Sequence, residues 1–250
     1  RAPPSASLPP HSFMASGHIA QCLGGILASR AGATVAVSGD LRLNGAQLVD
    51  GVRSLAAGLL ERGVRPGDVV AVVGFNSIEY MELLLAIPYI GAIVAPLNYR
   101  WSFEEAAQAL ELVRPSAFIF DGAYSSWALR LMESQSFSSI CLYITIGDPV
   151  NTGQGANFVS VDHVKRSCRG TAEMEPVSAP RDVALICFTS GTTGQPKGVA
   201  ISHTSLIIQS LAKIAVVGYG LPTYCPSVPY RRDLFMLGHT DGWRLPCPDT

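Results

Sequence analysis

The sequence predicts an α/β fold in which a mostly parallel sheet is flanked by helices on both faces. Short apolar runs alternate with longer segments in which apolar residues recur at helical spacing, an order that is typical of parallel sheets. The run Val69–Val73 is unbroken and mostly β-branched, as expected for a strand that is buried on both faces. Apolar residues make up 48% of the chain and charged residues 15%, so the chain can form a sizeable core.

Helices are expected where an apolar stripe of helical period lies between capping and breaking residues. Ser102 and Glu105 form a capping box, and Asn76, three residues before Glu79, is a second N-cap candidate. Several of the expected helices end at a glycine or just before a proline. The expected helices cover residues 17–31, 48–60, 76–91, 102–114, 127–132 and 207–215.

Strands are expected at the short apolar runs, with loops where glycine, proline and polar residues gather. The expected strands cover residues 34–37, 69–73, 93–95, 117–120, 140–146 and 183–187, and the expected loops cover 148–157 and 170–181. The longest apolar stretch, Leu83 to Leu97, contains Pro88 and Pro96. Because it is shorter than the roughly 18–20 residues that span a bilayer, it is interpreted as a buried helix followed by a buried strand. No membrane span is expected.

Charge and cysteine usage exclude several kinds of partner. The net charge of −1 gives no electrostatic basis for binding nucleic acid or an anionic membrane. The six cysteines have no paired spacing, so buried thiols in a reducing compartment are expected, without disulfides or a zinc site. The five histidines include no pair four residues apart, and no metal site on one helix face is expected.

The most informative segment is Phe188–Val199, which follows directly on an expected strand. Its glycines allow backbone N–H groups to approach and surround an anion. Its hydroxyl groups add donors, Lys197 adds a compact positive charge, and Pro196 stiffens the turn before it. The pattern predicts a polyphosphate site. Its candidate residues are Thr189, Ser190, Gly191, Thr192, Thr193, Gly194 and Lys197.

This segment differs from the common nucleotide-binding loop. In that motif four residues separate the first glycine from Gly-Lys-Ser/Thr. Here four residues separate Gly191 from Pro196, and Lys197 is followed by Gly198. The alternative interpretation is a surface hairpin rich in turn residues. The length of the pattern favours the phosphate site.

The segment resembles the phosphate-binding signature of the adenylate-forming superfamily, which includes acyl-CoA synthetases, luciferases and peptide-synthetase adenylation domains. The resemblance extends over residues 17 to about 217 and includes Asn76–Ser77 and Gly91–Asn98. Tyr99–Ser102 is most similar to the plant branch of 2-succinylbenzoate–CoA ligases. So are Gly17–Leu23 and Val49–Leu60. The resemblance implies that residues 17–217 are the N-terminal part of a large AMP-binding domain.

The resemblance also implies a chemistry in two half-reactions. A carboxylate attacks the α-phosphate of ATP with Mg²⁺, and the thiol of coenzyme A then displaces AMP. The phosphate loop would hold the β and γ phosphates. His203 stands where family members often have histidine, although a packed or capping histidine is the favoured interpretation. No residue of this chain is expected to be catalytic, since the mobile lysine of the family lies beyond the matched segment.

Both ends of the chain differ in character from residues 17–217. Residues 1–16 hold four prolines and four serines around Met14, which fits either a transit peptide or translated sequence upstream of a start codon. Residues 218–250 hold several prolines and no periodic apolar pattern. The codons permitted for Leu221 to Phe235, read one nucleotide later, allow a Pro-Leu-Cys-His-Ile-Gly-Gly sequence that resembles the next family motif. Residues 218–250 are therefore expected to be an unstructured, out-of-frame tail.

These observations leave three functions open. The first is a truncated, inactive form of a ligase that makes 2-succinylbenzoyl-CoA for phylloquinone or menaquinone synthesis. The second is another carboxylate–CoA ligase, of the 4-coumarate or fatty-acyl type. The third is a non-catalytic fragment that binds nucleotide. The plant branch implies a chloroplast or peroxisome and a small carboxylate as partner, and it implies no particular oligomeric state.

Overall fold

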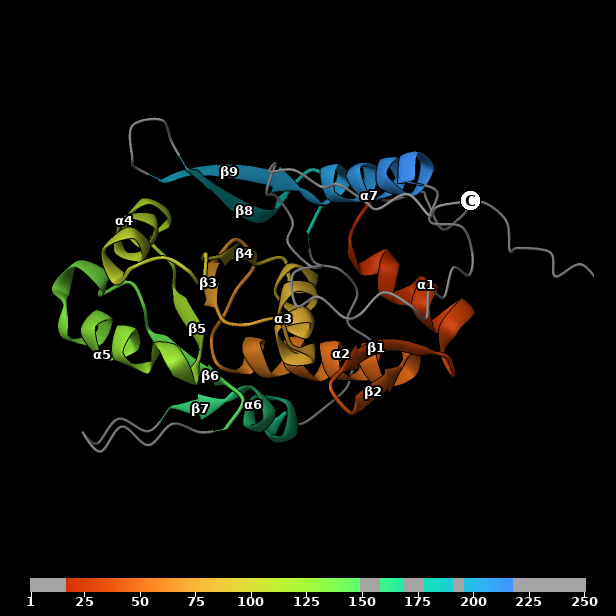
Figure 1. Cartoon of the computed structure of the whole chain (residues 1–250), viewed down its shortest axis with the longest axis horizontal. Helices are drawn as coiled ribbons and strands as arrows, with labels where there is room; N and C mark the ends of the chain where they lie inside the picture. The colour runs from red at the N-terminus through yellow and green to blue at the C-terminus, as the bar shows by residue number, and fades with distance from the viewer. Residues whose placement is uncertain (1–16, 149–157, 169–177, 191–195, 218–250) are drawn as a thin grey trace, which may run out of the picture.

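A seven-stranded sheet organises the part of the chain that the structure, a computed structural model, describes: residues 17–148, 158–168, 178–190 and 196–217 (Figure 1). The strand order is β7-β6-β5-β3-β4-β8-β9, and all neighbours are parallel except β8 and β9. The strands are β3 (Val69–Val73), β4 (Ile93–Pro96), β5 (Ala117–Asp121), β6 (Leu142–Ile146), β7 (Val159–Ser160), β8 (Val183–Ser190) and β9 (Pro196–Ser202). The predicted α/β class is confirmed.

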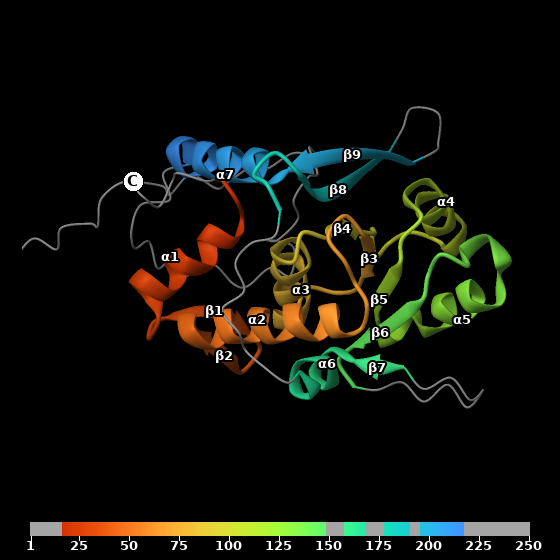
Figure 2. The ribbon, with the colours of Figure 1, turned by 180° about the vertical axis from the view of Figure 1, so that it is seen from behind.

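Helices cover both faces of this sheet, as Figures 1 and 2 show from opposite sides. One core cluster includes buried residues of α1, α2, α3 and α6, and the other includes buried residues of α4 and α5. The helices are α1 (Ala20–Arg30), α2 (Gly45–Glu61), α3 (Ile78–Tyr89), α4 (Phe103–Val113), α5 (Ser125–Glu133), α6 (Val161–Ser167) and α7 (His203–Val217), with short 3₁₀ turns at Gly122–Tyr124 and Gln135–Phe137.

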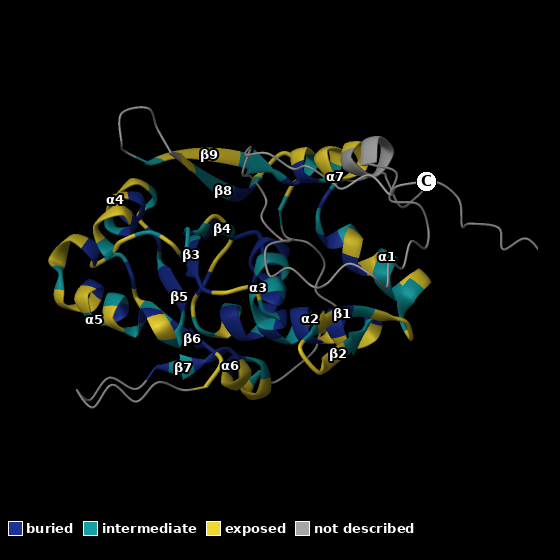
Figure 3. Cartoon of the chain, viewed as in Figure 1, coloured by how far each residue is buried: buried dark blue, intermediate teal, exposed yellow. Residues whose placement is uncertain are grey.

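Strand β3 lies at the centre of the sheet and contributes to both cores. Val70 and Val72 belong to the core under α2 and α3, whereas Ala71 and Val73 belong to the core under α4 and α5. All four are fully buried (Figure 3). The alternation of side chains along a strand explains this division, and the continuous apolar run is what two covered faces require.

Capping confirms one predicted helix start and corrects another. Ser102 Oγ accepts from the Glu105 amide at 3.2 Å, and the Glu105 carboxylate accepts from the Ser102 amide at 2.7 Å. Helix α3, however, is capped by Ser77 and not by Asn76. Ser77 has extended backbone dihedrals, and its hydroxyl accepts from the Tyr80 amide at 3.0 Å. An N-cap residue needs both an extended backbone and a side chain that accepts from an amide of the first turn. The spacing of Asn76 and Glu79 in the sequence indicates neither property.

The first predicted strand lies outside the main sheet. β1 (Thr34–Ser38) pairs antiparallel with β2 (Leu41–Asn44), which was not predicted, around a turn in which Gly39 has φ of 58°. A connection this short can join only antiparallel strands. β7 and α6 were also missed, because they have 2 and 7 residues and therefore too few positions to show a period.

The interpretation of Leu83–Leu97 is confirmed, since this stretch forms the end of α3, with Pro88 inside the helix, and then β4. Among the described residues, no helix has the length and hydropathy of a membrane span. The expectation of buried thiols is wrong for the four described cysteines. Cys22 and Cys141 are exposed, and Cys168 and Cys187 are half-buried, although Cys187 packs against the core under α2 and α3.

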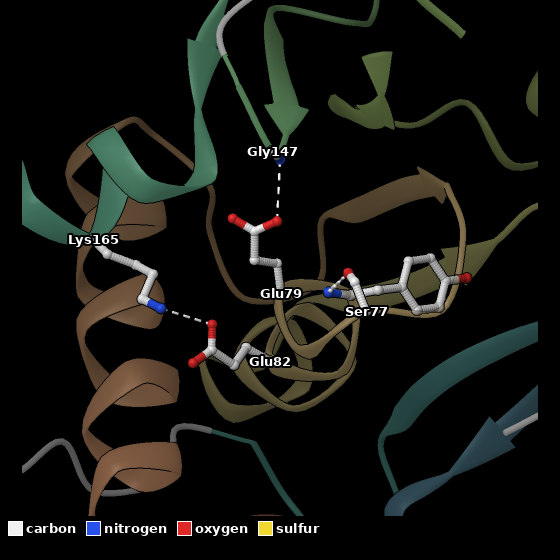
Figure 4. A network of polar contacts seen from close by, with 6 residues as sticks. Ser77, Glu79, Glu82, Gly147 and Lys165 are labelled. Carbon is white, nitrogen blue, oxygen red and sulfur yellow. Dashed lines mark hydrogen bonds and ion pairs between the residues drawn. The ribbon is translucent and has the colours of Figure 1, made fainter. Parts of the chain in front are cut away.

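A buried ion pair joins α6 to α3 (Figure 4). The Lys165 ammonium donates to the Glu82 carboxylate at 2.8 Å, and the Glu82 side chain is 1% exposed. Burial raises the pKa of Glu82, and the Lys165 ammonium opposes that rise. Nearby, the Glu79 carboxylate accepts from the Gly147 amide at 3.1 Å. These contacts fix α6 and the end of β6 against α3.

Two glycines of α2 allow α3 and α6 to approach it closely. A Cβ atom at Gly51 would collide with the Glu82 carboxylate. A Cβ atom at Gly58 would lie 2.5 Å from the Val164 carbonyl oxygen and 2.6 Å from Val164 Cγ1. At Gly58 the contact is with the backbone of α6, so an added Cβ would displace that helix, whereas at Gly51 it would displace the Glu82 side chain from Lys165. Close packing therefore explains both glycines, against their low helix propensity.

We predict that Lys165→Met will lower the free energy of unfolding by about 3–5 kcal/mol, because it leaves the Glu82 carboxylate buried without a cation. Arg130→Met is the matched control. It breaks the exposed Arg130–Glu104 pair, whose side chains are 53% and 69% exposed, and should change stability little. Urea unfolding at neutral pH measures both variants. Equal effects of the two substitutions would contradict the assigned role of the buried pair.

We also predict that Gly58→Ala will destabilise the protein by about 1–3 kcal/mol through overpacking against Val164. Helix propensity alone predicts the opposite sign, a gain of about 1 kcal/mol. Gly32→Ala serves as the control, because a Cβ atom there meets nothing within 4 Å. Thermal unfolding distinguishes the two outcomes, and a stabilised Gly58→Ala protein would show that α6 does not pack as described.

Candidate functional site

The candidate phosphate residues lie at the end of the β8–β9 hairpin. Thr189 of β8 is paired with Lys197 of β9, and Ser190 is paired with Pro196. Thr189 and Lys197 are both exposed. The structure therefore brings a hydroxyl residue and the cationic residue opposite each other at the two ends of the loop. The other loop candidates, Gly191, Thr192, Thr193 and Gly194, lie outside the described residues.

The hairpin is attached to the sheet through β4. β8 runs parallel to β4 with Val94 opposite Leu185, and both Ala184 and Leu185 are buried. The carboxyl ends of β8, β4 and β3 consequently lie at the same edge of the sheet. In open α/β sheets this is the edge where ligands bind. The described flanks of the predicted site, Thr189 and Lys197, lie at this edge.

Aromatic side chains line the same edge beside the hairpin. The Trp101 ring, after β4, meets the Phe188 ring of β8 edge-on with centroids 5.8 Å apart. The Phe75 ring, after β3, lies 5.6 Å from the Tyr99 ring and is 49% exposed. The Arg100 guanidinium lies 5.1 Å from the Tyr99 ring centroid. This edge therefore offers flat apolar surface and a second cation near the phosphate candidates.

These aromatic residues were only partly identified from the sequence. Tyr99 and Trp101 belong to the motif that carries the family resemblance, but Phe75 and Phe188 were given no role. A position directly after a buried strand, combined with a large apolar side chain, is the signal that could have identified Phe75. Phe188 was part of the phosphate motif, and its packing against Trp101 depends on the neighbouring strand.

His203 lies away from the phosphate residues. It follows β9 and begins α7, at the end of β9 opposite to Lys197, and its side chain is fully buried. Burial, reinforced by the neighbouring His18 ring, lowers the pKa of His203 to about 4. The packed-histidine interpretation is therefore confirmed.

The Glu79–Gly147 contact lies away from the hairpin along the sheet. Gly147, which Glu79 contacts, follows β6, and strands β5, β3 and β4 lie between β6 and β8. Among the described residues, no three His, Cys, Asp or Glu side chains come together as a metal site would need. The acidic contacts are thus part of the packing of α3 and α6.

Known proteins with similar sequences are acyl-CoA ligases. A 2-succinylbenzoate–CoA ligase of Arabidopsis thaliana, described as chloroplastic or peroxisomal, is 42% identical over 206 residues, which are 81% of this chain and 36% of that protein. A long-chain-fatty-acid–CoA ligase of Thermus thermophilus is 30% identical over 80% of this chain and 35% of that protein. The chain therefore spans only about a third of the length of these relatives.

Solved structures show the same fold. An anthranilate–CoA ligase in complex with anthranoyl-AMP gives a TM-score of 0.71 at 22% identity, over 78% of this chain and 36% of that chain. A Rhodopseudomonas palustris protein described as a long-chain-fatty-acid CoA ligase also gives 0.71, at 26% identity, over 81% of this chain and 48% of that chain.

The sequence model of the AMP-binding enzyme family matches residues 27–236. This match includes the whole described sheet and the candidate hairpin. It also extends past residue 217, where the change of frame is predicted. Because the match covers most of the chain, the protein belongs to the AMP-binding enzyme family.

Proposed function

We propose that this chain supplies the phosphate-binding part of an AMP-forming acid–thiol ligase. In this proposal a carboxylate attacks the α-phosphate of ATP, pyrophosphate leaves, and the thiol of coenzyme A then displaces AMP from the acyl-adenylate. The observation that carries the proposal is the pairing of Thr189 with Lys197 at the carboxyl edge of the sheet. Family membership and the acyl-CoA ligase relatives support it.

The proposed binding set combines the described flanks of the loop with the loop itself. It consists of Thr189, Ser190, Gly191, Thr192, Thr193, Gly194 and Lys197. Hydroxyl and backbone N–H donors, together with one ammonium, suit the oxygens of a polyphosphate. At nucleotide sites Mg²⁺ is usually held by substrate phosphates, water and one or two carboxylates. The proposed set contains no carboxylate, so these residues would act on Mg²⁺ only through the phosphates.

The role of the loop is electrostatic. When the α-phosphate is attacked, negative charge increases on the pyrophosphate that departs. Donors that are already in position stabilise this charge without reorganisation at the moment of reaction. The exposed side chains of Thr189 and Lys197 stand on two paired strands, which limits their motion relative to each other. The hairpin would thus orient the leaving group as well as stabilise it.

The carboxylate substrate that we propose is 2-succinylbenzoate, in a chloroplast or a peroxisome. The 42% identical Arabidopsis ligase supports this choice, and so does the Tyr99–Ser102 segment. A second candidate is a ligase for fatty acids or for other aromatic acids, which the Thermus relative and a 28% identical peroxisomal benzoate–CoA ligase of Arabidopsis favour. Both candidates use the same phosphate chemistry.

The substrate prediction requires a protein in which residues 27–217 replace the matching segment of the Arabidopsis ligase. We expect this chimera to form AMP from ATP and coenzyme A with 2-succinylbenzoate, and to be much slower with medium-chain fatty acids and 4-coumarate. AMP release measured with each acid tests the prediction. Because the rest of the chimera comes from the Arabidopsis ligase, its choice among acids also reflects that protein, and the decisive outcome is the rate with 2-succinylbenzoate. No rate with 2-succinylbenzoate from a folded chimera would contradict the substrate assignment.

In the same chimera, Lys197→Ala should lower the rate of adenylate formation by about two to three decades, which corresponds to about 2–4 kcal/mol for a well-placed electrostatic contact. Thioester formation from supplied acyl-adenylate should fall much less, because pyrophosphate has already left. ATP–pyrophosphate exchange and thioester formation measure the two steps. Arg42→Ala is the control, since Arg42 is an exposed cation on β2. Equal losses in both half-reactions would remove the phosphate role of Lys197.

A further inference from the structure

Two buried histidines from distant parts of the chain are stacked on each other. His18 is 1% exposed and His203 is fully buried. Their ring centroids are 3.8 Å apart, and the planes differ by 22°. Ser178 Oγ lies 2.8 Å from His18 Nε2 and 3.2 Å from His203 Nε2. The three side chains form one hydrogen-bonded cluster, which we call the histidine clamp.

The hydrogen bonds of the histidine clamp have a defined direction. The Ala20 amide donates to His18 Nδ1 at 3.1 Å, so this nitrogen carries no proton and His18 Nε2 does. His18 Nε2 therefore donates to Ser178 Oγ, which leaves the Ser178 hydroxyl proton available to donate to His203 Nε2, the direction that we assign to this bond. The proton of the neutral His203 ring is then on Nδ1, which is buried and has no hydrogen-bond partner among the described residues. The arrangement requires both rings to be neutral.

The histidine clamp joins three segments at the base of the β8–β9 hairpin. His18 directly precedes the first turn of α1, Ser178 precedes β8, and His203 begins α7. Next to it, the Thr204 amide and hydroxyl both donate to the Pro180 carbonyl at 2.9 Å. The start of α1 is thus held against the segment that precedes β8 and against the start of α7, which follows β9.

Little charge is available nearby to stabilise a protonated ring. Asp182, in the segment before β8, is the charged group among the described residues that raises the pKa of both rings. The first turns of α1 and α7 contain no acidic residue. Burial outweighs Asp182 and lowers the pKa of His18 and, to about 4, that of His203. Each ring also repels a charge on the other.

The lowered pKa values of His18 and His203 determine how the stability of the closed clamp depends on pH. The unfolded or opened chain binds protons near the ordinary histidine pKa of 6.5, and the closed clamp binds them at lower pH. The closed state is therefore fully favoured above pH 6.5. It loses stability as pH falls from 6.5 toward the value of about 4 for His203.

We propose that His18, Ser178 and His203 form an acid-sensitive clamp that holds α1 on the base of the phosphate hairpin and opens when an imidazole takes up a proton. A proton on His203 Nε2 removes the acceptor of the Ser178 hydroxyl and places a cation against the His18 ring. Opening then releases the start of α1, while the sheet and α2 to α6 keep their contacts.

Hydrogen exchange on the 250-residue chain at pH 7.5 and pH 5.0 tests the clamp. After correction for intrinsic exchange rates, we expect at least about tenfold more opening of residues 18–30 at pH 5.0, since one pH unit is worth about tenfold per titrating group. β5 should show no such change. In His203→Gln the ratio should fall, because only His18 is left to titrate, and in the double variant His18→Gln/His203→Gln it should fall to within about twofold. His163→Gln, at an exposed histidine of α6, should keep the full response.

An α1 segment that is insensitive to pH, or an unchanged response in folded His203→Gln, would overturn the proposal. If His203→Gln does not fold, NMR titration of the His18 and His203 ring protons in the unmodified chain tests the proposal instead. We expect His18 and His203 to remain neutral below pH 6 and to titrate together with the loss of α1 protection. Ordinary titration near pH 6.5 with α1 still protected would contradict the clamp.

Discussion

The parallel pairing of β8 with β4 is the contact on which the site depends. β8 follows β7 and α6 along the chain, yet β7 lies at the far edge of the sheet. These two strands, consecutive in the chain, are therefore far apart in the sheet, and the position of β8 depends on its pairing with β4. Val94 opposite Leu185 and the burial of Ala184 and Leu185 hold β8 in place, and β9 joins the sheet through β8. If this pairing were lost, Thr189 and Lys197 would still face each other, but away from the edge that β3 and β4 define.

The two ends of the hairpin are held in different ways. At its base, the His18–Ser178–His203 clamp joins it to the segment before α1, and the Thr204–Pro180 hydrogen bonds join the segment before β8 to α7. Near its loop, Phe188 packs on Trp101, whereas residues Lys197 to Ala200 of β9 are exposed. Among the described strands β9 is an edge, and Val199 is 47% exposed. Such edges are usually covered or protected by charge. The hairpin is therefore held by side-chain contacts at its base, whereas the described edge of β9 is exposed.

The sequence predicted correctly those features that depend on interactions between residues close together in the chain. Val69–Val73 and the Ser102 capping box were predicted correctly, because burial on two faces and a three-residue hydrogen bond leave clear marks in the sequence. The N-cap of α3 was assigned to Asn76 and not to Ser77, since the backbone angle at a cap cannot be read from spacing. The type of the candidate site could be predicted from hydroxyl, glycine and lysine content. The position of the hairpin could not, and neither could the contact of His18 with Ser178, 160 residues away, because strand order is a long-range property.

The central claim is that the sheet presents the β8–β9 hairpin as a polyphosphate site. Titration of the ¹⁵N-labelled chain with magnesium pyrophosphate, followed by backbone amide shifts, tests this claim most directly. We expect the largest shifts at Thr189, Ser190, Lys197 and Gly198, and none at Gly147 on the other side of β5, β3 and β4. Binding with shifts centred on Gly147, or binding that leaves Thr189 and Lys197 unchanged, would contradict the claim.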